Sequence, residues 1–143
     1  TRPLSALPPN VRVISHDLSP QSQFEVLAGA RAVAIPILST SIVSAGISTA
    51  LNAMLLGKCV IGTAGPGFSD IFDEEVLLCP PEDAVQLAAV LDRAWSDEDI
   101  RRRTALAGFR HARSNGSLDD FYQRVVDAVA VWLRAKRETG TCR

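Results

Sequence analysis

The strongest constraint on the fold is an alternation, over residues 11–80, of short β-branched apolar runs with amphipathic segments. The runs are apolar on both alternating faces, which is typical of parallel strands covered by helices on both sides. The predicted strands are Val11–Ser15, Ala32–Pro36, Cys59–Thr63 and Val76–Cys79. This βαβαβ order predicts an α/β fold, a doubly wound (Rossmann-like) parallel sheet of about four strands.

Two helices are expected between the first three strands. The first begins near Ser19, a capping residue, with Pro20 at its first helical position. Its expected apolar stripe is Phe24, Leu27 and Ala28. The second runs from about Gly46 to Leu56 and ends at Gly57. Its expected apolar stripe is Ile47, Ala50, Leu51, Met54 and Leu55.

Residues 81–135 read as C-terminal helices, followed by a tail over 136–143. The first, Glu82 to Trp95, is expected to bury one face, made of Val85, Ala88, Leu91 and Trp95. Ser96 opens a predicted capping box for the next helix, which runs to about Arg113. The last helix carries the apolar stripe Leu118, Phe121, Tyr122, Val125, Val129, Trp132 and Leu133.

Charge and composition exclude several classes of protein. The chain has 15 Lys+Arg against 16 Asp+Glu, so no basic patch marks a nucleic-acid partner. Its apolar stretches are shorter than the roughly 20 residues that span a bilayer, and we expect no transmembrane segment. The three cysteines match no disulfide or zinc pattern, and Cys59 and Cys79 are expected as core thiols. A reduced, cytoplasmic protein without a metal follows from these features.

The first candidate site lies between the second strand and the helix at Gly46. The connection Ile37–Ala45 is rich in Ser and Thr, and it leads into a helix start whose free N–H groups and dipole favour an anion such as phosphate. Ser44, Ser48 and Asn52 follow one another at four-residue spacing and form a polar edge beside the apolar stripe. The alternative is structural, with Ser44 as a helix cap and the other two on a solvated face.

Other candidates are weaker. The loop Thr63–Asp70 has two glycines around a proline, but it lacks the spacing of a phosphate-binding motif, and a plain turn is favoured. His16 and His111 have no partner at ligand or triad spacing. The acidic residues over 70–75 are interpreted as solvated charge at a turn.

The stretch SAGISTALNAMLLGKCVIGTAGPGFSDIF resembles the donor-site signature of the large retaining family of GT-B glycosyltransferases, the glycosyl transferases group 1. Their pattern is roughly E-x7-E-A-M-x-x-G-x-P-V-I-(A/G)-T, followed by a glycine-bearing loop and an acid. The residues in register are Ala53, Met54, Gly57, Lys58, Val60, Ile61, Gly62, Thr63, Gly65, Gly67 and Asp70. The resemblance covers about residues 9–133.

The resemblance implies a GT-B C-terminal domain that binds a nucleotide diphosphate sugar donor, without a cofactor. The two motif glutamates, which contact the donor sugar and the ribose, correspond to Ser44 and Asn52. The diphosphate site corresponds to Gly46, Ile47 and Ser48, and the nucleobase contacts to Ser15, His16 and Leu18. The implied activity is transfer of a hexosyl group to a glycan or lipid-linked acceptor, which a missing N-terminal domain would bind.

Two departures from the pattern leave alternatives open. Both motif glutamates are replaced, which weakens donor contacts because asparagine lacks a charge-assisted hydrogen bond. The alternatives are therefore a non-catalytic nucleotide-sugar-binding module or a sugar-nucleotide epimerase of the same architecture. The basic residues that neutralise the diphosphate in the family are also missing. We expect residues 1–143 to be a single incomplete domain with no catalytic residue of its own, inactive as an isolated fragment, and peripheral membrane attachment of the full-length protein stays open.

Overall fold

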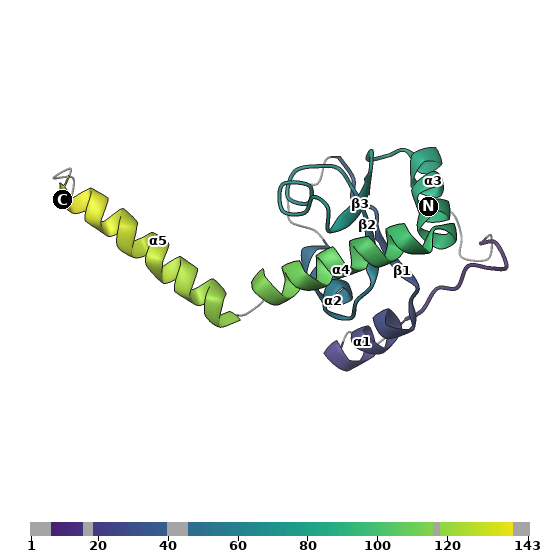
Figure 1. Ribbon diagram of the computed structural model, residues 1–143, viewed down its shortest axis with the longest axis horizontal. Helices are drawn as coiled ribbons and strands as arrows, with labels where there is room; N and C mark the ends of the chain where they lie inside the picture. Colours follow the sequence, from purple (N-terminus) through teal and green to yellow (C-terminus); the bar gives the residue numbers. More distant parts are fainter. Residues whose placement is uncertain (1–6, 16–18, 40–45, 116–117, 139–143) are drawn as a thin grey trace.

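A three-stranded parallel sheet forms the centre of the computed structural model, which describes residues 7–15, 19–39, 46–115 and 118–138 (Figure 1). Its order is β1-β2-β3, with β1 at Ala32–Ile35, β2 at Cys59–Thr63 and β3 at Val76–Cys79. In register, Val33 pairs with Val60 and Ile61 with Leu77. The predicted α/β class and parallel sheet are confirmed.

The prediction of about four strands is wrong for the described residues, because Val11–Ser15 forms no strand. This segment is exposed, with Val13 at 62%. β-branched residues favour a strand only where a neighbouring strand and a packed face receive them. Among the described residues no strand pairs with this segment, so its sequence preference is not realised.

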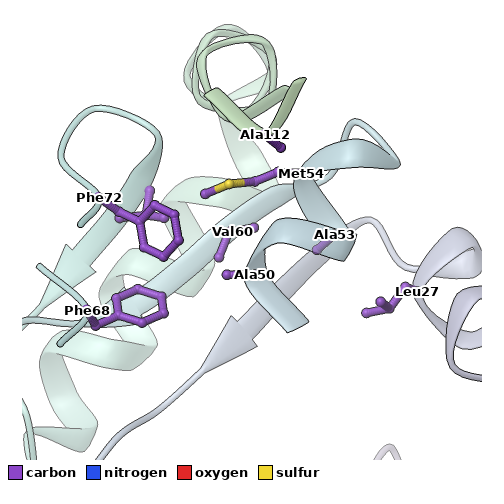
Figure 2. Close-up of a cluster of buried hydrophobic side chains, with 9 residues drawn as sticks. Leu27, Ala50, Ala53, Met54, Val60, Phe68, Phe72 and Ala112 are labelled. Carbon is purple, nitrogen blue, oxygen red and sulfur yellow. The ribbon is translucent and has the colours of Figure 1, made fainter. Parts of the chain in front are cut away.

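Helices α1 (Pro20–Gly29) and α2 (Ile47–Leu55) belong to the larger of two buried clusters. Figure 2 shows this cluster, in which Met54 of α2 lies close to β2 and reaches toward α4. Its buried members are Leu27, Ala50, Ala53, Met54, Val60, Phe68, Phe72, Val76 and Ala112. The helix predicted from about Gly46 is confirmed, although Leu55 at its end is exposed.

The start of α1 is confirmed, whereas its predicted apolar stripe is wrong in part. Ser19 accepts a hydrogen bond from the Ser22 N–H at 3.2 Å and so caps the helix, and Pro20 takes the first position. Only Leu27 is buried, while Phe24 and Ala28 are exposed. The helix covers the cluster with one residue, because it packs at the periphery against α2.

Helix α3 (Ala84–Ser96) covers the other face of the sheet. The side of the helix that it buries there is not the predicted one. The residues that pack there are Leu87, Val90 and Ala94, in a cluster with Cys59 and Ile61. Trp95 is 63% exposed and Val85 is 77% exposed. The helix is apolar on both sides, so its sequence fits two stripes, and the packing against the sheet decides between them.

Helix α4 (Glu98–Asn115) crosses the amino end of the sheet from one cluster to the other. Ala105 packs with the α3 cluster, and Ala112 packs with Met54 of α2. Asp97 caps the helix by accepting from the Ile100 N–H at 2.9 Å. The predicted capping residue Ser96 instead donates to the Asp92 carbonyl at 2.8 Å, so that prediction is wrong.

Helix α5 (Leu118–Glu138) extends away from the sheet in Figure 1. Its predicted apolar stripe is exposed wherever the side chains are described, from Tyr122 to Leu133. No described helix is long and apolar enough to cross a membrane. Cys59 and Cys79 are buried as predicted, and burial raises the pKa of the Cys59 thiol to about 11, despite the nearby Arg101. Cys142 lies outside the described residues.

Candidate functional site

The carboxyl ends of the three strands meet at one edge of the sheet, which we call the carboxyl edge. From there the chain continues as 36–39 after β1, as 64–70 after β2 and as 80–83 after β3. Open α/β sheets bind ligands at this edge, because helices begin there with unsatisfied N–H groups. Helix α2 begins here, since its cap residue Gly46 packs against Ile35 and Ile37 of the β1 end.

Gly46 gives α2 a start without a side chain in the way. Its φ of +80° lies in the left-handed region, and an added Cβ would lie 2.4 Å from Ile35 Cγ2. The residue offers no side-chain cap to the first turn, so backbone N–H groups and the helix dipole face the edge directly. Ser48 is exposed and Asn52 half-buried, one turn apart on the same helix. This arrangement is suited to a diphosphate with hydroxyl groups beside it.

Thr63 fixes the chain as it leaves β1. This buried threonine is 4% exposed, and its hydroxyl oxygen accepts from the Ile37 N–H at 2.9 Å. The same hydroxyl donates to the Ile37 carbonyl at 2.8 Å. One side chain from the end of β2 thereby satisfies both backbone polar groups of Ile37. The position of Ile37 after β1 is therefore fixed.

The residues predicted for donor binding fall into three groups. Gly46, Ile47 and Ser48 lie at the start of α2, and Asn52 lies one turn after Ser48 on the same helix. Ser15 is exposed in the extended stretch ahead of α1. His16, Leu18 and Ser44 lie outside the described residues.

The loop after β2 is held by its own hydrogen bonds. The Gly65 N–H donates to Ser69 Oγ at 3.1 Å, and the Ser69 hydroxyl donates back to the Gly65 carbonyl at 3.0 Å. The Gly67 N–H donates to the Asp70 carboxylate at 3.1 Å. Because its side chains already occupy these donors, the loop has a structural role, and Phe68 packs against Gly62 beneath it.

A cavity of about 610 Å³ lies at the opposite, amino end of β3, against α4. Here His111 Nδ1 lies 2.9 Å from Glu75 Oε1, and the His111 ring lies 5.4 Å from that of Phe72. Burial would raise the pKa of Glu75, yet backbone N–H groups of Asp73 and Glu75 and the His111 ring lower it overall. Sequence reasoning missed this pair, because 36 residues separate its members and no motif joins them.

The basic residues near the strands are occupied elsewhere. The Lys58 ammonium donates to the Ala28 carbonyl at 2.7 Å, at the end of α1. The Arg31 guanidinium lies 4.6 Å from the centre of the Trp95 ring and donates to the Trp95 carbonyl at 3.1 Å. Within the part of the chain that the structure describes, no group of three or more His, Cys, Asp or Glu could hold a metal ion.

The three-stranded parallel sheet with its flanking helices is the C-terminal part of a GT-B fold. The family model described as "Glycosyl transferases group 1" matches residues 9–111. The chain belongs to this family. No curated protein sequence matches it.

Solved structures agree with this fold. Sucrose-phosphate synthase from Thermosynechococcus elongatus is 22% identical with a TM-score of 0.62, over 77% of this chain and 27% of that one. Anabaena HepE in complex with UDP-glucose is 19% identical with a TM-score of 0.64, over 75% and 29%. The C-terminal domain of LpcC, a group 1 glycosyl transferase from Francisella tularensis, is 22% identical with a TM-score of 0.56, over 76% and 53%. The chain thus spans 27% and 29% of the first two structures, and 53% of the LpcC structure, which is itself a C-terminal domain.

Proposed function

We propose that this chain is the donor-binding part of a glycosyltransferase that moves a hexosyl group from a nucleotide diphosphate sugar to a glycan or lipid-linked acceptor. The observation that carries the proposal is the start of α2, where Gly46 has positive φ and makes no side-chain hydrogen bond to the first turn at the carboxyl edge. Family membership supports the reaction class. The relative HepE is solved with UDP-glucose, which makes a uridine donor the first to test.

In this proposal the diphosphate lies against the N–H groups of Gly46, Ile47 and Ser48. A leaving nucleoside diphosphate carries negative charge that a helix dipole and unpaired amides stabilise. Asn52, one turn after Ser48, accepts or donates a hydrogen bond to a ribose hydroxyl. Ser15, His16, Leu18 and Ser44 complete the proposed donor contacts. The chemistry and the acceptor contacts are assigned to groups outside this chain, and the full-length protein is proposed to be cytoplasmic.

The test is a donor hydrolysis and transfer assay on the full-length gene product, with UDP-glucose and then other nucleotide diphosphate hexoses. Turnover that falls at least tenfold in a Gly46→Val variant is expected, because a β-branched side chain at positive φ displaces the helix start. Gly29→Ala is the matched control, since an added Cβ there meets nothing within 4 Å. Absence of turnover with every donor would contradict the proposal.

A second function, a non-catalytic nucleotide-sugar-binding module, is favoured by one feature, the neutral Asn52 at the second motif position. Calorimetry separates the two functions, because submicromolar donor binding without turnover supports the module. An Asn52→Glu variant adds a charge-assisted hydrogen bond to the ribose, which is roughly twice as strong as a neutral one. Activity that appears only in this variant would identify a decayed enzyme.

A further inference from the structure

We propose that Glu82 is a positioning residue for the donor site, whose carboxylate holds residues 36–39 after β1, next to the start of α2. This inference rests on the proposed function and deepens it, because it names a carboxylate outside the motif positions. Glu82 acts through Ser39 and not by contact with the donor.

The backbone of Glu82 is strained. Its φ is 59°, and it is the one non-glycine residue with positive φ in the part of the chain that the structure describes. In this region the Cβ of an L-residue crowds the following carbonyl, so glycine is favoured and a long side chain is uncommon. Residues kept in such conformations cluster at functional sites, where interactions of the side chain offset the cost of the strain.

The side chain of Glu82 makes a contact that glycine could not make. Ser39 Oγ donates to Glu82 Oε1 at 3.0 Å. Ser39 follows β1 and Glu82 follows β3, while β2 lies between these two strands. Neighbouring strands lie about 4.8 Å apart, so the contact bridges roughly 10 Å across the carboxyl end of β2.

This bridge is the third of three restraints on the same stretch of chain. Thr63 binds both backbone groups of Ile37, two residues before Ser39. Gly46 packs against Ile35 and Ile37 at the other end of the stretch. A binding constellation has to be held within about 0.5 Å of its productive geometry. Because Glu82 binds Ser39 from the end of β3, its loss should loosen residues 37–39 without disturbing the core.

The first test measures positioning without any ligand. Backbone amide hydrogen exchange of residues 37–39 is compared in the full-length gene product and in the variants Glu82→Gly, Glu82→Gln and Ser39→Ala. Glu82→Gly and Ser39→Ala should exchange at least threefold faster, whereas glutamine retains an acceptor and should stay within twofold. The Tm of Glu82→Gly should not fall, since glycine relieves the positive φ. Unchanged exchange in Glu82→Gly and Ser39→Ala would overturn the proposal.

The second test measures the donor constant, as KM for transfer or as Kd by calorimetry. Glu82→Gly and Ser39→Ala should each weaken the donor constant roughly three- to tenfold, and their double variant no further than either alone. A donor constant that stays unchanged while exchange rises would also overturn the proposal. Failure of the unaltered protein to bind any nucleotide sugar counts against the proposed function, and the exchange result then still decides whether Glu82 positions the chain.

Discussion

The two edges of the sheet contrast in how their polar groups are used. At the amino end, Glu75 pairs with His111 of α4 at 2.9 Å, beside a cavity of about 610 Å³. At the carboxyl edge, Gly46 leaves the start of α2 without a cap, and Thr63 and Glu82 hold the chain beside it. The cavity and the carboxyl group with a lowered pKa therefore lie at the amino end, where Glu75 and His111 already pair with each other.

This contrast separates a structural contact from a binding surface. A perturbed pKa indicates a functional site only in part, because ion pairs that hold elements together perturb pKa values as well. The Glu75–His111 contact joins the turn before β3 to α4, next to Gly108, whose added Cβ would lie 2.8 Å from Met54. At the carboxyl edge, the cap residue Gly46 makes no side-chain hydrogen bond to the first turn of α2, and we therefore place the proposed anion site there.

The largest effect on this contrast is expected from Gly46→Ala. The left-handed φ and the 2.4 Å approach to Ile35 together should lower the free energy of unfolding by about 2–4 kcal/mol. Chemical denaturation measures the loss, with Gly29→Ala as the control that should change it by less than about 1 kcal/mol. A loss no larger than that of the control would show that α2 does not start against Ile35.

A Thr63→Val substitution should have the next largest effect. It removes both hydrogen bonds to Ile37 at a buried position, which should cost about 1–3 kcal/mol in the free energy of unfolding. Thr63→Ser keeps the hydroxyl and should recover most of the loss. Equal denaturation midpoints for valine and serine would mean that the hydroxyl does not hold the chain after β1.

At the amino end, Glu75→Gln should lower stability by about 1 kcal/mol and leave donor affinity unchanged. The folded-state pKa of Glu75 is lowered, so its contribution is present above the ordinary carboxyl pKa. That contribution is lost as the pH falls through the ordinary value toward the lowered one.

The measurement for Glu75 is a denaturation series from neutral to acid pH, with the exposed neighbour Glu74→Gln as control. The difference in the free energy of unfolding between Glu75→Gln and the unaltered protein should be constant near neutral pH. It should shrink toward zero in acid. A difference that grows in acid would contradict the assigned sign. A donor affinity that falls in Glu75→Gln would place the donor at the amino end of the sheet and contradict a purely structural role for the Glu75–His111 pair.

The smallest effect is expected from Lys58→Met. The lysine bonds the Ala28 carbonyl near the surface, and its removal should cost less than about 0.5 kcal/mol. Because Lys58 lies within the stretch that resembles the family motif, it is the alternative candidate for a cation that neutralises the diphosphate. Calorimetry should nonetheless find a donor affinity within twofold of the unaltered protein, and a tenfold loss would assign Lys58 to the site.

Local patterns predicted the parts of the fold that depend on neighbours in the sequence. The second helix and β2 could be predicted because Gly57 separates a clear helical stripe from a run that is buried on both faces. The candidate site at Gly46 came from the same pattern, since a helix that follows a parallel strand begins at the ligand edge. Its geometry toward Ile35 needed the structure.

Contacts between distant segments could not be predicted. Val11–Ser15 has strand composition but no strand beside it, and α3 has two apolar stripes of which the sheet selects Leu87, Val90 and Ala94. The Glu75–His111 and Ser39–Glu82 pairs join residues 36 and 43 positions apart, without any periodicity to reveal them. The sequence predicts Glu82 as the first residue of a helix, whereas that helix begins at Ala84 and Glu82 has a φ of 59°.

The central claim is that a nucleotide diphosphate sugar binds at the start of α2. The most direct measurement is backbone amide chemical-shift mapping of the protein titrated with UDP-glucose and then other nucleotide diphosphate hexoses. We expect the largest shifts at Gly46, Ile47 and Ser48, with a smaller one at Asn52. Shifts concentrated around Glu75 and His111, or no shift with any donor, would contradict it.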